Sequence, residues 1–364
     1  MIEPPDAGPP APPDPPAADA PPGDPGPQPF RFTGTAGEYF RIWIVNLLLS
    51  VVTLGVYSAW AKVRRLRYFY GHTSLAGQTF GYHAAPKAIL KGRLIAYAVV
   101  GVLAVLGQVA PLAASALYFP LVMLMPIVLV RAFRFRAANS SYGGIRFAFD
   151  GMEAEAYRVF LFLPILVPFT LGLAYPFVTK QQREFFVSES RHGRSQFGLE
   201  LPTGAVYRIY LLAGLGLLVW FSVGLATFIG AAGAAGIRDP QATPGTGVLI
   251  GIGVLYAGIG VAFVAVRTAF ENLVWNHTML AGHRFESRLR AGRMLWIYAS
   301  NIAAIAATLG LAVPWARIRL ADYRAESLTL VPGGPLVTEA MAGSDEASAT
   351  GAELSEALDF DFGL

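Results

Sequence analysis

The chain contains no cysteine and few charged residues. The absence of cysteine excludes disulfide bonds and thiolate chemistry, although it does not identify the cellular compartment. Lys, Arg, Asp and Glu make up only 14% of the 364 residues, against about 25% in an ordinary soluble domain. Because 54% of the residues are hydrophobic, this composition favours a membrane protein.

The two ends of the chain lack basic residues and long apolar runs. Residues 1–29 contain thirteen prolines and five acids, and residues 331–364 contain seven acids. Neither end has enough apolar surface to offset its chain entropy, so we expect two disordered tails. Residues 30–330 hold all 28 basic residues and twelve acids, so this part is far more basic than the net charge of +4 for the whole chain suggests. Because the first thirty residues also lack a cleavable signal, we expect insertion through internal segments.

Seven apolar stretches approach the length of about 20 residues that spans a bilayer. None has an ionisable Lys, Arg, Asp or Glu in its middle. We expect each stretch to be helical, because backbone groups in lipid must be satisfied within their own segment. In the fourth stretch, Pro164, Pro168 and Pro176 predict local irregularity. The stretches are Ile42 to Trp60, Leu94 to Ala110, Pro111 to Val130, Val159 to Val178, Ile209 to Gly236, Gly247 to Val266 and Met294 to Ala316.

The basic residues between the stretches favour a topology in which only four of them span. If all seven cross, the two sides collect 12 and 16 Lys and Arg, a bias too weak to orient the chain. If the first, fourth and seventh instead enter and return, the tally is 27 against 1. We expect an all-α membrane protein with four to seven spanning helices, and with both tails and the basic loops in the cytoplasm. Seven crossings stay open, because the first and seventh stretches are long enough to span.

Self-comparison indicates a degenerate three-fold repeat. The repeat units cover about 30–93, 147–208 and 285–330, with hairpins 94–130 and 209–266 between them. A shift of 117 residues superposes "TLG" at Thr53 on Thr170, and a shift of 255 superposes it on Thr308. The second shift also superposes Asn46, Trp60, Lys62 and Arg64 on Asn301, Trp315, Arg317 and Arg319.

A smaller module, Ser/Thr-x3-Gly-x2-Phe, lies between the apolar stretches. It starts at Thr73, Ser140 and Thr278, and a fourth copy at Ser190 has Arg194 in place of glycine. Alternating aromatic residues predict short extended pieces that present their rings on one face, with the glycine allowing the turn before them. We expect these pieces on the cytoplasmic surface of the bilayer; the simpler alternative is that they only brace the helices.

Clusters of basic residues adjoin the apolar stretches and are interleaved with aromatic side chains. This pattern is typical of a belt that meets anionic lipid headgroups, so we expect anionic membrane lipids as partners and no nucleic acid. Protein partners are not indicated. The predicted headgroup and topology residues are Trp60, Lys62, Arg64, Arg65, Arg67, Arg131, Arg134, Arg136, Trp315, Arg317 and Arg319.

Signals for enzyme chemistry are lacking. The five histidines have no metal-ligand spacing, and no nucleophile motif, phosphate-binding loop or intramembrane carboxylate pair occurs. We therefore expect no catalytic residue, metal or cofactor. Asn46 and Asn301 are candidate intramembrane polar residues, either as a paired site or as partners in hydrogen bonds between helices.

The segment from "FRFTGTAGEYFRIW" through "TLGVYSAWAKVRRLRY" resembles the YjgN-like bacterial inner-membrane proteins, a family of unknown function. The resemblance covers residues 30 to 330 and implies a multi-pass protein of the bacterial cytoplasmic membrane. It implies no activity, substrate or catalytic residue. We expect non-enzymatic passage or handling of a small molecule or lipid. The alternative is a structural or adaptor protein with a basic lipid-binding face and partner-recruiting tails.

Overall fold

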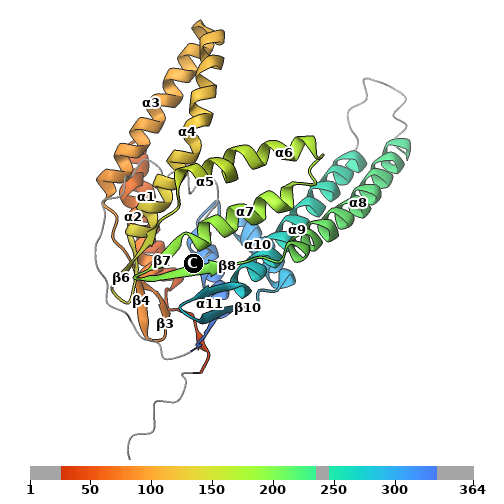
Figure 1. Ribbon diagram of the computed structural model, residues 1–364. Helices are drawn as coiled ribbons and strands as arrows, with labels where there is room; N and C mark the ends of the chain where they lie inside the picture. Colours follow the sequence, from red (N-terminus) through yellow and green to blue (C-terminus); the bar gives the residue numbers. More distant parts are fainter. Residues whose placement is uncertain (1–25, 235–245, 334–364) are drawn as a thin grey trace, which may run out of the picture.

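Strands and helices alternate along the part of the chain that the structure describes, residues 26–234 and 246–333. In this computed structural model, strand pairs are connected by a helix, a turn and a second helix that returns to the strands. The strands therefore gather at one end of the molecule, and the helices extend away from them as hairpins (Figure 1).

The eleven strands of the described residues form one antiparallel sheet in the order β1-β11-β10-β9-β8-β7-β6-β5-β4-β3-β2. The edge strands β1 and β2 flank Phe30, so the sheet starts and ends at one short stretch of chain and is nearly closed. We call it the strand ring. Its strands are β1 (Gln28–Pro29), β2 (Arg31–Phe32), β3 (Thr73–Leu75), β4 (Gln78–Tyr82), β5 (Ser140–Tyr142), β6 (Ile145–Phe149), β7 (Ser190–His192), β8 (Ser195–Leu199), β9 (Thr278–Leu280), β10 (His283–Ser287) and β11 (Leu328–Val331).

The Ser/Thr-x3-Gly-x2-Phe modules are tight strand hairpins in this ring. Leu75 pairs with Gln78, so the loop between β3 and β4 has two residues, Ala76 and Gly77. Both have positive φ, +47° and +78°, as a type I′ turn requires. Glycine occupies this second turn position in the β5–β6 and β9–β10 hairpins as well, with φ of +82° at Gly144 and Gly282.

The expectation of a mostly helical membrane protein is confirmed, but the class all-α is wrong, because the short extended pieces are not separate. The chain is mostly helical, but its strands join edge to edge in the strand ring. The physical reason is that a short strand alone leaves its backbone N–H and C=O groups unpaired, whereas a nearly closed ring pairs them and leaves no long edge. The sequence does not predict this sheet, because its strands are short and apolar helices dominate the composition.

The helices of the described residues form five antiparallel hairpins. Neighbouring hairpins pack against one another, and α1 also packs against α11, so the helices follow the circular order of the strands. The hairpins are α1 (Ala36–Val52) with α2 (Ser58–Gly71); α3 (Pro86–Val109) with α4 (Pro111–Ala138); α5 (Glu153–Tyr157), η1 (Arg158–Phe162) and α6 (Leu163–Phe169) with α7 (Tyr175–Ser188); α8 (Thr203–Ala234) with α9 (Thr246–Asn276); and α10 (Ala291–Ala307) with α11 (Val313–Glu326).

Two hairpins are long and apolar enough to cross a membrane. The four candidate spans are Pro86–Val109, Pro111–Ala138, Thr203–Gly230 and Gly251–Asn276. Their side chains are mostly exposed in the protein alone, as expected of helices that face lipid.

The other three hairpins are short, and each is broken by a Thr-Leu-Gly turn. The first, fourth and seventh apolar stretches of the sequence are therefore not single helices. α1 ends at Val52, α6 at Phe169 and α10 at Ala307, and in each case the next helix returns toward the strand ring. The fourth stretch is irregular beside its prolines: η1 is a π-helical turn whose hydrogen bond runs from Leu163 N–H to the Arg158 carbonyl.

Parts of the predicted tails belong to the fold. Gln28 and Pro29 form β1, which pairs with Leu330 and Thr329 of β11, and Val331 pairs with Arg284. These residues are ordered because they complete the strand ring, which corrects the tail boundaries. Residues 1–25 and 334–364, to which the rest of the tail prediction applies, lie outside the described residues.

Candidate ligand site in the strand ring

Five phenylalanines form most of an aromatic circle inside the strand ring. They are Phe30, Phe80, Phe147, Phe197 and Phe285, one from each module and one from the stretch between β1 and β2. Their ring centroids lie 6.1 Å apart for Phe30–Phe80, 6.5 Å for Phe30–Phe285, 6.5 Å for Phe197–Phe285 and 6.3 Å for Phe147–Phe197. Separations of this size allow favourable stacked or tilted contacts between aromatic rings.

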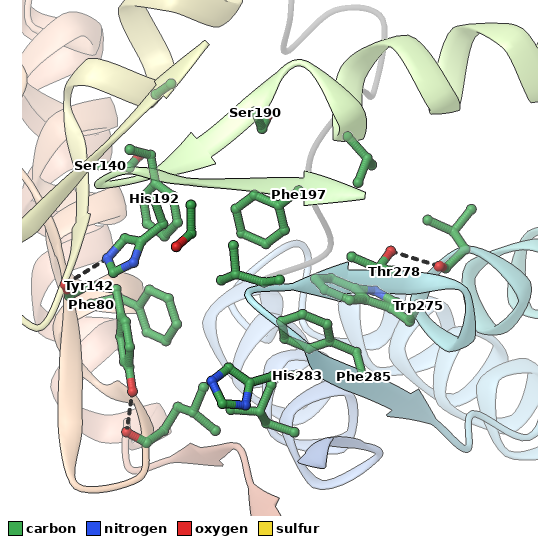
Figure 2. Close-up of a pocket in the computed structure, with 18 of the residues that line it drawn as sticks. Phe80, Ser140, Tyr142, Ser190, His192, Phe197, Trp275, Thr278, His283 and Phe285 are labelled. Carbon is green, nitrogen blue, oxygen red and sulfur yellow. Dashed lines mark hydrogen bonds between the residues drawn. The ribbon is translucent and has the colours of Figure 1, made fainter. Parts of the chain in front are cut away.

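The remaining side of the circle is filled by Tyr142 and His192. The Phe80 ring lies 4.8 Å from Tyr142, Tyr142 lies 5.6 Å from His192, and His192 lies 4.9 Å from Phe147. Figure 2 shows Tyr142 beside Phe80 and His192 above them, with Phe197 and Phe285 across the space from these rings.

A second layer of side chains inside the ring comes from β3, β5, β7, β9 and β11, the first strand of each pair. Because side chains alternate between the two faces of a strand, one residue of each short strand points into the ring. These residues line a cavity of about 440 Å³ together with the five phenylalanines, and we call this cavity the lumen. The second-layer residues are Leu75, Tyr142, His192, Leu280 and Leu330.

The helices that return to the strands close one side of the lumen. On each of these helices, the residue three positions before the following strand lines the lumen. These residues are Tyr70 of α2, Ala137 of α4, Val187 of α7 and Trp275 of α9. The Trp275 ring lies 5.4 Å from Phe285. The lumen wall is thus built by the same part of four successive hairpins.

Charged residues line the lumen only on its helical side. Arg136, Arg183 and Glu271 belong to α4, α7 and α9. Glu271 Oε1 accepts hydrogen bonds from Arg267 Nε at 3.2 Å and from Arg324 at 3.3 Å. The Arg183 guanidinium lies 6.0 Å from the Phe270 ring centroid, a cation–π distance. This side therefore combines a carboxylate shared by two arginines with aromatic surface.

His192 and Tyr142 are titratable side chains of the aromatic circle. Burial lowers the pKa of His192, because a charged imidazolium loses hydration there; hydrogen bonds to the backbone at Tyr142 and Ile145 oppose this effect. Its Nε2 donates to the Tyr142 carbonyl at 3.2 Å. Burial also raises the pKa of Tyr142, whose hydroxyl donates to the Leu75 carbonyl at 3.0 Å. Both groups are therefore neutral near pH 7.

The predicted headgroup residues lie on three returning helices, α2, α4 and α11, rather than in one cluster. Arg136 lines the lumen, and Arg134 donates to the Gly151 carbonyl at 2.9 Å. Lys62 is buried. On α11, the Arg319 guanidinium lies 5.2 Å from the Trp315 ring, and Arg317 donates to the Tyr39 hydroxyl at 3.2 Å. The list of predicted residues is completed by Trp60, Arg64, Arg65 and Arg67 on α2 and Arg131 on α4.

Asn46 and Asn301 are buried in two different short hairpins. Asn46 Oδ1 accepts from Arg64 at 3.5 Å, and Asn301 Oδ1 accepts from Arg319 at 3.3 Å. Each asparagine thus joins the outgoing helix of its hairpin to an arginine on the returning helix. Leu163 and Gln181 stand at the corresponding positions of the remaining short hairpin, which runs from α5 to α7 and lacks this pair.

His72 and His277, which are equivalent in the sequence, end α2 and α9. Their Nδ1 atoms each lie 2.8 Å from a carbonyl oxygen four residues earlier, at Tyr68 and Leu273. Such contacts satisfy carbonyl groups that a helix end leaves unpaired. Within residues 26–234 and 246–333, no three His, Asp or Glu side chains are grouped as a metal site would need.

Sequence reasoning found the phenylalanines but misplaced them. The modules contained Phe80, Phe147, Phe197 and Phe285 at a constant spacing from Ser or Thr. The sequence predicts rings on one face of separate extended pieces, whereas all four rings line one lumen; Figure 2 shows Phe80, Phe197 and Phe285 around it. The recurrence of one inward phenylalanine per module was the signal that could have indicated closure. The second layer carried no such signal, because its residue types differ.

Comparisons with known proteins agree with this membrane architecture. A family model described as "bacterial protein of unknown function (DUF898)" matches residues 27–357. The chain belongs to this family. It is 26% identical over 344 residues to inner membrane protein YjgN of Salmonella typhimurium, covering 81% of this chain and 86% of the relative. It is also 31% identical over 152 residues to the protein of that name from Escherichia coli O157:H7, covering 42% and 38% of the two chains.

No solved structure matches the chain. The named relatives and the four apolar helices identify this member of the DUF898 family as a multi-pass protein of the bacterial inner membrane.

Proposed function

We propose that the protein is non-enzymatic and holds a small apolar molecule or a lipid in its lumen, beside the membrane. The observation that carries the proposal is the aromatic circle around a cavity of about 440 Å³. Ligand sites in proteins are concave, mostly apolar cavities of this order, with a few polar groups that orient the ligand. Arg136, Arg183 and His192 are the polar groups that would do so here.

The packing of the second long hairpin supports the lumen, rather than the space between α8 and α9, as the place of binding. Trp220 of α8 donates from Nε1 to the Val254 carbonyl of α9 at 2.7 Å. A Cβ added at Gly258 would lie 2.0 Å from Trp220 Cδ1, so the glycine is what admits the indole. Small residues used in this way are typical of closely packed membrane helices.

In this proposal the strand ring faces the cytoplasm. The basic residues of α2, α4 and α11 then lie beside anionic lipid headgroups, in agreement with the charge bias of the sequence. We also propose that the chain is a repeat of five units, each a strand pair with one helix hairpin, rather than three. The fifth unit is completed by β11 and the stretch from β1 to β2, which meet although they lie at opposite ends of the chain.

Retention of a ligand by variants of strand β9 would test the proposal. Leu280 points into the lumen, and its neighbour Met279 is exposed on the opposite face. Leu280→Trp should fill part of the lumen, whereas Met279→Trp adds the same side chain outside it. The wild-type protein and both variants would be purified in a mild detergent, and retained small molecules would be identified by native and denaturing mass spectrometry.

We expect a molecule bound to the wild type and to Met279→Trp, and its loss from Leu280→Trp. Equal retention by both variants, or no retained molecule in any of them after extraction into lipid nanodiscs, would contradict lumen binding. That result would favour the alternative of a structural or adaptor protein, for which the lumen is only a packing defect.

A further inference from the structure

The three Thr-Leu-Gly turns of the short hairpins have one backbone conformation. Leu54, Leu171 and Leu309 each have φ of +49°, and the following glycines have φ of +89°, +89° and +97°. The hydrogen bonds repeat as well. In each turn the glycine N–H donates to a carbonyl five residues earlier, over 2.7 Å at Gly55 and 2.8 Å at Gly172 and Gly310. This is the pattern of a Schellman helix end.

Leucine is an unfavourable residue at this position. In the left-handed region the Cβ of an L-residue crowds the backbone, and glycine or asparagine relieves that strain. Internal packing does not compensate, because Leu54, Leu171 and Leu309 are 95%, 94% and 95% exposed. A strained, apolar and fully exposed residue in three equivalent turns indicates a contact outside the protein.

The turns leave few backbone groups for water to satisfy. Thr53 shows the pattern: its hydroxyl donates to the Leu49 carbonyl at 2.7 Å and accepts from the Tyr57 N–H at 2.9 Å. Thr170 and Thr308 make the corresponding bonds, at 2.9 Å on both sides for Thr170 and at 2.7 and 2.9 Å for Thr308. Internal pairing of this kind is what a segment needs in order to enter hydrocarbon.

The turns lie beside the spanning helices. Arg93, which directly precedes the apolar part of α3, donates a hydrogen bond to Ser58 just after the first turn. Tyr207, at the start of α8, donates to the Leu173 carbonyl in the second turn at 3.1 Å. Along the third short hairpin, α10 packs against α9 through Met294 and Val264. The first two turns are therefore held where spanning helices enter the bilayer.

We propose that Leu54, Leu171 and Leu309 are lipid-inserting side chains, and that the three turns wedge between acyl chains of the leaflet nearest the strand ring. Acyl chains are the occupant that the spanning helices bring next to these leucines. The threonine and glycine close the turn, and the strained leucine supplies the apolar contact. This inference does not depend on whether the lumen holds a ligand.

The absence of native cysteine allows a direct test. Single variants Leu54→Cys, Leu171→Cys and Leu309→Cys would be labelled with the fluorophore NBD and reconstituted into phosphatidylcholine–phosphatidylglycerol vesicles. Met279→Cys, on the exposed face of β9, is the matched control, since Met279 is 51% exposed and lies in the strand ring. Correct folding would be checked by elution of each labelled variant as one symmetric peak.

We expect blue-shifted emission at all three leucine positions. Nitroxide-labelled lipids should quench it severalfold more strongly than they quench the Met279→Cys control, and aqueous iodide should quench the control best. Iodide-sensitive emission without lipid quenching at any of the three turns would overturn the proposal. For a variant that fails to fold, the second readout is a spin label at the exposed residue after the glycine, Val56, Leu173 or Leu311. Greater relaxation by oxygen than by a water-soluble nickel complex is expected there, and the reverse would overturn the proposal.

Discussion

The long and short helix hairpins start from the same place and end in different environments. Both follow a strand pair of the strand ring and return to the next one. The long hairpins, α3–α4 and α8–α9, continue through apolar helices long enough to span. The short ones turn back at Thr-Leu-Gly. The position of one turn therefore sets how far a hairpin extends from the strand ring, and the returning helices α2, α4, α7 and α9 line the lumen in both hairpin types.

The largest expected effect separates the two hairpin types by depth. Val100 lies in the middle of the apolar part of α3, and Val51 lies beside the first short turn; both are exposed, 63% and 66%. An aspartate at the centre of a spanning helix costs about 2.5–3.5 kcal/mol in insertion. We expect Val100→Asp to lower the membrane-inserted fraction far more than Val51→Asp in a glycosylation-based insertion assay. Equal losses would mean that α1 also reaches the bilayer centre.

A single added methyl group should disturb the packing between α8 and α9. Ala at Gly258 would place its Cβ 2.0 Å from Trp220, whereas Gly260 has no atom within 4 Å of that position. Overpacking of this kind costs about 1–3 kcal/mol. We expect Gly258→Ala to lower the SDS-unfolding free energy of the purified protein and Gly260→Ala to leave it nearly unchanged. An unchanged unfolding free energy in Gly258→Ala would show that the Trp220 indole can move away from this position at little cost.

The ends of the two hairpin types should respond to glycine with opposite signs. Leu309 is strained at positive φ, so Leu309→Gly should raise stability in detergent by up to about 1 kcal/mol. Leu112 lies in the first turn of helix α4 and does not have a positive φ, so Leu112→Gly should lower stability by about 0.5–1 kcal/mol. Thermal unfolding in detergent measures both. A loss of stability in Leu309→Gly would show that the Leu309 side chain makes a stabilising contact in detergent that outweighs the backbone strain.

The ring that carries both hairpin types should lose stability in mild acid. Partial burial holds the pKa of His192 below its ordinary 6.5, so the unfolded chain binds the proton more readily than the folded one. Its contribution is therefore present above about pH 6.5 and is lost as the pH falls below that value. His192→Leu, which copies Leu280 of the same layer, should flatten this part of the stability profile. An unchanged profile would assign the pH dependence to other groups.

The membrane part of this fold follows from local patterns, and the ring does not. Uncharged apolar runs predicted the long helices, and the charge bias favoured the return of the first, fourth and seventh stretches without locating their turns. Closure of the strand ring depends on pairing between β1 and β11, whose paired residues are 300 and 302 positions apart, and no local period encodes such a contact. The lumen was missed for this reason: Phe30 meets Phe285 only after closure.

For the buried asparagines too, the sequence reveals the residues but not their contacts. Asn46 and Asn301 were recognised from the repeat, because both stand seven residues before a Thr-Leu-Gly turn. Their arginine partners sit across the turn, which requires knowing that the helix reverses there. Once the hairpin is known, the pairing follows from the length of the two helices.

The most direct test of the central claim is the sidedness of single cysteines in sealed inside-out and right-side-out vesicles. Thr79→Cys, Gln196→Cys and Met279→Cys lie on strands β4, β8 and β9, and Leu112→Cys lies at the far end of the first long hairpin. If the short hairpins return and the long ones cross, an impermeant maleimide should label the three strand positions from one side and Leu112→Cys from the other. Labelling of Gln196→Cys from the side opposite to Thr79→Cys would contradict the account, because the α6–α7 hairpin would then cross the membrane.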